Sequence, residues 1–163
     1  MNVEKILEEI QLLLDGVANS SQGKTDSVWT KGIKRELCQL GKKNNFDVSA
    51  AGCKGADTGE WLYDLVWSAG SEDFMTDIPL VVESEWSMNF DDISWDFGKL
   101  LVSKSDIKLF VFQQASKEGV KNVQQKLGNL ITKFIKKMPG EYYLLAGYSY
   151  SDHTFIYKQI PLS

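Results

Sequence analysis

The sequence LVVESEWS, residues 80–87, joins an apolar run to two glutamates one residue apart and a tryptophan. Apolar and β-branched residues in such a run predict a buried strand over 78–86. Because side chains alternate between the faces of a strand, Glu83 and Glu85 are expected on one face and Ser84 on the other. Burying like charges together is costly, so two acids at the end of a buried strand need an explanation.

The elements around this strand follow from hydrophobic periodicity and turn residues. The pattern predicts helices over 3–18, 28–43, 92–103 and 117–138, the last ended by Pro139-Gly140. It predicts strands over 46–51, 61–67, 78–86, 107–113, 142–150 and 154–160, with a polar loop at 72–77 and the last two strands as a hairpin. This order predicts a single α/β domain over 1–163, with a mixed central sheet flanked by helices on both faces.

The composition bounds the class of protein. The chain has 163 residues, of which 43% are hydrophobic and 12% aromatic, as expected for a globular domain. No apolar run approaches the roughly 18–20 residues that span a bilayer, so no membrane partner is expected. Cys38 and Cys53 form no CxxC motif and cannot make a four-cysteine zinc site, and a single histidine, His153, excludes any site that needs two histidines. The acidic N-terminal segment does not resemble a signal peptide, and a cytoplasmic protein with reduced thiols is expected.

Charge is unevenly distributed along the chain. Residues 57–96 hold eleven acids and no Lys or Arg, whereas residues 97–137 hold nine lysines against two acids. One interpretation is ordinary solvated faces. The other is a carboxylate site whose flanking basic segments hold a polyanion.

The acids of residues 57–96 predict a carboxylate site if the strands expected at 61–67 and 78–86 are neighbours in the sheet. Asp64, in the strand expected at 61–67, would then lie beside Glu83. Mg²⁺ takes oxygen ligands, commonly one or two carboxylates with water and phosphate, and the local sequence offers no basic counter-ion. A divalent cation is therefore expected there. Two alternatives remain: a solvent-facing strand edge, and an acid pair of the glycosidase type.

The pattern YD, then about twenty residues, then VVESEW on consecutive strands, followed by a helix and a dense apolar strand, resembles the PD-(D/E)xK nuclease superfamily. The resemblance covers roughly residues 28–115 and implies a restriction endonuclease-like fold. Asp64 matches the first acid of the motif and Glu83 the second. Glu85 stands where the family usually has lysine, as in some restriction endonucleases, and Tyr63 stands where proline is usual.

The resemblance implies a nuclease that hydrolyses phosphodiester bonds in DNA with Mg²⁺ or Mn²⁺. Asp64 and Glu83 would hold the metal, together with the backbone carbonyl of Ser84. Glu85 would ligate the metal or orient water. Lys99, in DFGKLL, would replace the motif lysine from the following helix, as in some relatives; an exposed helix lysine is the alternative.

Further residues are expected at the edges of such a site. A glutamate of the first helix, Glu8 or Glu9, would be an extra metal ligand, with a solvated face as the alternative. Lysines of the long helix would track phosphates: Lys121, Lys133, Lys136 and Lys137. Four tryptophans near the acids would either stack on bases or pack against the sheet: Trp61, Trp67, Trp86 and Trp95.

Two functions follow as hypotheses. The first is a Mg²⁺-dependent endonuclease acting on DNA. The second is a catalytically inactive protein of the same fold that serves in binding, which the missing motif lysine favours. No DNA-reading motif is visible, so recognition would come from a homodimer or a separate specificity partner.

Overall fold

The computed structural model describes residues 2–71 and 74–163, and the order of its elements is the one predicted from the sequence. The helices are α1 (Val3–Ser21), α2 (Asp26–Lys43), α3 (Phe90–Val102) and α4 (Lys117–Lys133). The strands are β1 (Asp47–Ser49), β2 (Leu65–Ser71), β3 (Phe74–Glu85), β4 (Ile107–Gln114), β5 (Tyr142–Ser149) and β6 (Thr154–Pro161).

The six strands form one mixed sheet in the order β1-β2-β3-β4-β5-β6. The β3–β4 and β4–β5 pairs are parallel, and the other three pairs are antiparallel. The predicted mixed sheet and the predicted final hairpin, β5–β6, are therefore confirmed. The carboxyl ends of β3, β4 and β5 consequently lie at the same edge of the sheet.

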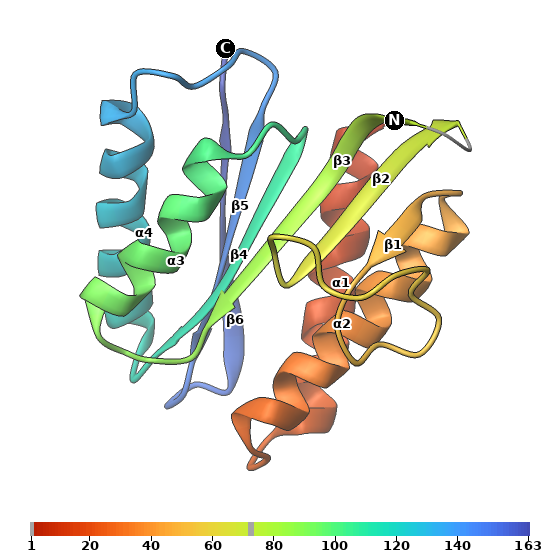
Figure 1. The fold of residues 1–163 in the computed structure, drawn as a ribbon. Coiled ribbons are helices and arrows are strands. Elements are labelled where there is room, and N and C mark those ends of the chain that lie inside the picture. Colours follow the sequence, from red (N-terminus) through yellow and green to blue (C-terminus); the bar gives the residue numbers. More distant parts are fainter. Residues whose placement is uncertain (1, 72–73) are drawn as a thin grey trace.

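The helices cover both faces of this sheet, as predicted (Figure 1). Helices α1 and α2 pack on one face over a core that includes Leu7, Leu37 and Leu80. Helices α3 and α4 pack on the other face over a core that includes Phe97 and Leu127. Burying apolar area stabilises the fold by roughly 25 cal/mol per Å². Strand β4 lies in the middle, and every residue from Ile107 to Phe112 is fully buried.

Three predicted elements differ most from the structure. Strand β2 begins at Leu65 rather than at Trp61, because Leu62 has a φ of 63° and takes the chain out of the extended conformation. Residues 74–77 belong to β3 rather than to a polar loop, and residues 72–73 of that predicted loop lie outside the described part of the chain. Helix α4 ends at Lys133 rather than at Met138, because Phe134 is extended, and Ile135 beyond it is 90% exposed.

The first helix and the last strand lie side by side. The Tyr157 hydroxyl of β6 donates to the Asp15 carboxylate at 2.7 Å and to the Gln11 carbonyl at 3.0 Å, both on α1.

Among the described residues, no helix combines the length and the apolar character needed to cross a membrane.

A buried ion pair closes the amino end of the parallel strands. The Nζ atom of Lys108 on β4 lies 2.9 Å from a Glu141 carboxylate oxygen, and the two side chains are 1% and 9% exposed. The same ammonium donates to the Ser103 carbonyl at 2.9 Å and to the Tyr143 hydroxyl at 3.3 Å. We call Lys108 with Glu141 the closed pair, because its charge is balanced and its donors are used inside the protein.

Candidate active site

The acids of the sequence pattern meet at the carboxyl end of β3. Antiparallel pairing sets Leu65 of β2 opposite Val82 of β3, so Asp64, just before β2, lies beside the last residues of β3. The Asp64 carboxylate accepts from the Ser84 backbone N–H at 2.9 Å and from the Ser84 hydroxyl at 2.7 Å. The predicted neighbourhood of Asp64 and Glu83 therefore exists, although Asp64 precedes the strand instead of lying within it.

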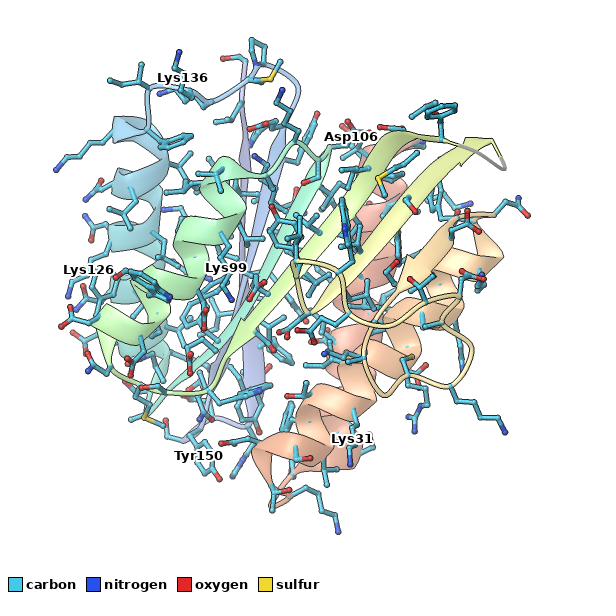
Figure 2. The ribbon with its side chains drawn as sticks, viewed as in Figure 1. Lys31, Lys99, Asp106, Lys126, Lys136 and Tyr150 are labelled. Carbon is cyan, nitrogen blue, oxygen red and sulfur yellow. The ribbon has the colours of Figure 1, made fainter. Side chains whose placement is uncertain are left out.

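Glu83 is buried at this point and is paired with a lysine of α3. The residue is 3% exposed, and its carboxylate lies 3.1 Å from the Lys99 ammonium. Lys99 also lies 2.8 Å from the Asp96 carboxylate, and its side chain is 43% exposed. Figure 2 shows Lys99 between α3 and the sheet. We call Lys99 with Glu83 the open pair, because the lysine reaches solvent while the carboxylate does not.

The electrostatics of the site are dominated by burial and by like charges. Burial, and then the negative charge of Asp64, raise the pKa of Glu83 to about 7, although Lys99 opposes the shift. Burial also raises the pKa of Glu85, as does its contact with Asp96. Burial lowers the pKa of Lys99, but its ion pairs with Asp96 and Glu83 outweigh this, and the net shift is upward. The site is therefore rich in negative charge and is poised to exchange a proton near neutral pH.

Asp64 is directed to the opposite side from the open pair. The Lys34 ammonium of α2 lies 3.6 Å from the Asp64 carboxylate and 3.6 Å from that of Glu60. The acids therefore have basic counter-ions, which come from helices on both sides and not from the acidic segment of residues 57–96. Lys34 was missed since it lies thirty residues before Asp64; its one sequence signal is a position next to the inward-facing Ile33.

The turn that follows β3 is held by neighbouring strand and helix ends. The Glu85 carboxylate accepts from the Ser87 N–H at 2.6 Å. The side-chain amide of Gln113 donates to the Trp86 carbonyl, and that of Gln114 donates to the Met88 carbonyl at 3.2 Å. The glutamines at the end of β4 thus fix the chain directly after the two glutamates.

Glu9 does not join these acids. Its carboxylate lies 2.9 Å from the Lys43 ammonium, in a groove between α1 and α2 that is also lined by Leu12 and Arg35. The structure therefore places Glu9 between the first two helices, and Glu8 is exposed on α1.

The lysines expected to track phosphates lie on α4 and in the segment after it, and all four are exposed: Lys121, Lys133, Lys136 and Lys137. Figure 2 shows Lys136 and Asp106 at one end of the molecule, with Tyr150 and Lys31 at the other. Asp106 precedes β4 and Tyr150 follows β5, so Lys136 lies at the edge opposite to the acids.

The tryptophans divide into two kinds. Trp67 is fully buried and donates to the Leu37 carbonyl at 3.1 Å. Trp86 packs against Trp29, with ring centroids 5.8 Å apart. Trp61 and Trp95 are instead 41% and 80% exposed.

The donor set suits a small oxygen-bound cation. Asp64 and Glu83 offer two carboxylates, and Mg²⁺ commonly needs only one or two, with water and phosphate completing its shell. Within residues 2–71 and 74–163, no group of three Asp, Glu, His or Cys side chains is arranged to hold a metal ion. A metal ion bound here would therefore take at most two protein carboxylates, with water and phosphate completing its shell.

Comparison of the chain with models of known protein families, with characterised proteins and with solved structures finds no match. The chemistry of the site must therefore be argued from its own geometry.

Proposed function

We propose that the protein is a Mg²⁺- or Mn²⁺-dependent endonuclease of the restriction endonuclease-like fold that hydrolyses phosphodiester bonds in DNA. One observation carries the proposal. Two carboxylates and a lysine, from three different elements, gather at the carboxyl end of β3, with Ser84 N–H 2.9 Å from Asp64 and Lys99 3.1 Å from Glu83. This is the set of residues that the resemblance to the PD-(D/E)xK superfamily implies.

Each residue has a role in this proposal. Asp64 and Glu83 would hold the metal, with the Ser84 carbonyl as a further oxygen. A bound divalent ion would supply a water of lowered pKa and would neutralise phosphate charge. Lys99, on the exposed side of Glu83, would stabilise charge that develops on the phosphate, the task of the missing motif lysine. Glu85 would orient water from the end of the strand.

Positively charged groups on the α2 side of these acids support a phosphate substrate. Lys34 reaches Asp64 from α2, and Lys31 lies one turn earlier on the same helix. Both line a hollow between α2 and Gly52. We therefore propose α2, rather than the lysines of α4, as the first contact for a DNA backbone near the acids.

A second candidate is a catalytically inactive binding protein of the same fold. It is favoured by the fact that each carboxylate is already engaged: Asp64 by Ser84 and Lys34, Glu83 by Lys99, and Glu85 by Ser87. A protein that had lost catalysis would keep such internal partners.

Nicking of supercoiled plasmid with Mg²⁺ or Mn²⁺ separates the two candidates. The wild type is expected to nick, and Asp64→Asn, which keeps the shape and removes the charge, is expected to abolish nicking. Asp77→Asn is the matched control, because Asp77 lies on the exposed opposite half of β3. No cleavage with either metal at high protein concentration favours the inactive protein. Equal cleavage by wild type and Asp64→Asn rules out this site as its source.

A further inference from the structure

The two sides of the candidate site differ in charge. On the side of α2, Lys31 and Lys34 line one hollow, and Lys31, Arg35 and Lys54 line the adjoining one. Lys34 is 12% exposed and lies between Glu60 and Asp64, so the basic surface that includes Lys31, Arg35 and Lys54 adjoins the acids. Phosphate groups are attracted to such a surface.

The side of α3 is acidic and aromatic. Its first turn carries Asp91 and Asp92, both exposed, and its next turn carries Asp96. Trp95 is 80% exposed and lies four residues before Lys99, so the two side chains are neighbours on the surface of the helix. The three aspartates of this side repel phosphates, while Trp95 offers a flat aromatic face to an uncharged group.

A second apolar group lies on the other flank of the acids. Leu62 is 70% exposed, and its φ of 63° places a γ-branched residue in the left-handed region, which is uncommon outside glycine, asparagine and aspartate. Its neighbour Trp61 is 41% exposed. The following residue, Tyr63, packs into the same core cluster as α3. This segment and α3 therefore face the same side of the sheet, with Glu83 between them.

We propose that the site takes a nucleic acid strand whose bases are unpaired, with its phosphates toward Lys31 and Lys34 and its bases toward Trp95. The inference rests on the proposed function, since it names the substrate class of that site. An unpaired strand exposes base faces that stack on aromatic side chains. A duplex hides its base faces and carries a second backbone, which would meet the aspartates of α3.

The test is a binding measurement that needs no cleavage. Fluorescence anisotropy in EDTA would compare one labelled DNA strand with the same strand annealed to its complement. The single strand is expected to bind about tenfold more tightly. Trp95→Ala is expected to weaken single-strand binding about tenfold, the loss of one stacked base, and duplex binding less than twofold. Trp95→Phe should recover most of the affinity, since it keeps an aromatic ring.

Phe74→Ala is the matched control, because Phe74 is 73% exposed at the opposite end of β3. The inference is overturned if the duplex binds as tightly as the single strand, if Trp95→Ala has no larger effect than Phe74→Ala, or if neither form binds. Tighter binding of single-stranded RNA of the same sequence also supports the inference, and it would identify the preferred unpaired strand as RNA instead of DNA. Plasmid nicking is scored separately, so a duplex-preferring nuclease would overturn this inference and leave the proposed function standing.

Discussion

The two ends of the parallel strands each hold a lysine beside a buried carboxylate, yet the two pairs differ in access and in balance. In the closed pair, Lys108 and Glu141 are almost fully buried, and the remaining donors of the lysine are used by Ser103 and Tyr143. In the open pair, Glu83 is equally buried, but Lys99 reaches solvent and further carboxylates crowd around it. A lysine–glutamate pair thus stabilises the packing at one end of the strands, where its charge is balanced. At the other end the same kind of pair belongs to a candidate site, where negative charge is in excess.

The largest effect should come from breaking the closed pair. Lys108→Met leaves Glu141 buried without its counter-charge, which is expected to lower the free energy of unfolding by about 3–5 kcal/mol. Because an apolar replacement of both partners removes that penalty, Lys108→Met with Glu141→Leu should recover most of the loss. Urea unfolding of the three proteins measures this. A loss below about 1 kcal/mol in the single variant would show that the closed pair does not differ from a surface ion pair.

The next effect concerns the proton of Glu83. The pKa of this carboxyl in the folded protein, about 7, lies above its usual 4.5, so the folded state holds a proton that the unfolded chain has released. Stability should therefore fall as pH rises from about 5 to 8, by about 2–3 kcal/mol for this one group.

Glu83→Gln isolates this effect, because the amide does not titrate. The difference in unfolding free energy between wild type and Glu83→Gln, measured by urea unfolding at several pH values, should move in favour of the variant as pH increases. A difference that stays constant over this range would mean that Glu83 is already ionised at pH 5.

Divalent ions should stabilise the protein through the site of the open pair and not through the closed pair, and this effect is smaller than the two before it. Binding at ten times the dissociation constant stabilises the folded state by about 1.4 kcal/mol. Mg²⁺ binds the ionised carboxylate, so thermal stabilisation by Mg²⁺ should be stronger at pH 8 than at pH 6. Asp64→Asn should remove it, and Lys108→Met should not. Equal stabilisation of Asp64→Asn by Mg²⁺ would place the ion elsewhere.

The smallest effect is expected for Lys99→Met at pH 7. Lys99 is half exposed, and Glu83 can respond to its loss by taking up a proton, so the cost should be about 1 kcal/mol or less. The variant should instead raise the pH at which Glu83 titrates, since Lys99 lowers the pKa of that carboxyl. The midpoint of the pH–stability profile reports this change, and an unchanged midpoint would mean that the open pair does not form in solution.

Much of this arrangement was predictable from local pattern. The order of ten elements, the mixed sheet and the placing of Glu83 at the end of a buried strand all follow from periodicity within short windows of sequence. The nearness of Asp64 also followed, because consecutive strands usually pair. These features depend on residues that are close along the chain.

The parts that were missed depend on contacts between distant segments or on single backbone angles. Lys34 and Asp64 come from different layers, and no local pattern links a lysine of α2 to that acid. The left-handed conformation of Leu62, just before β2, has no composition signal, since this position is not a glycine. Glu9 lies at helical spacing suited to a site, yet packing with α2 directs it to Lys43.

The contact between α1 and β6 has a consequence for the order in which the chain assembles. Tyr157 and Gln11 are 146 residues apart, so α1 meets this partner strand only after the residues between them have been synthesised. Contacts between residues so far apart in sequence slow folding, because the chain loses the entropy of loop closure before these contacts stabilise it. Until β6 is in place, part of the apolar face of α1 is uncovered, and apolar surface exposed during folding favours aggregation.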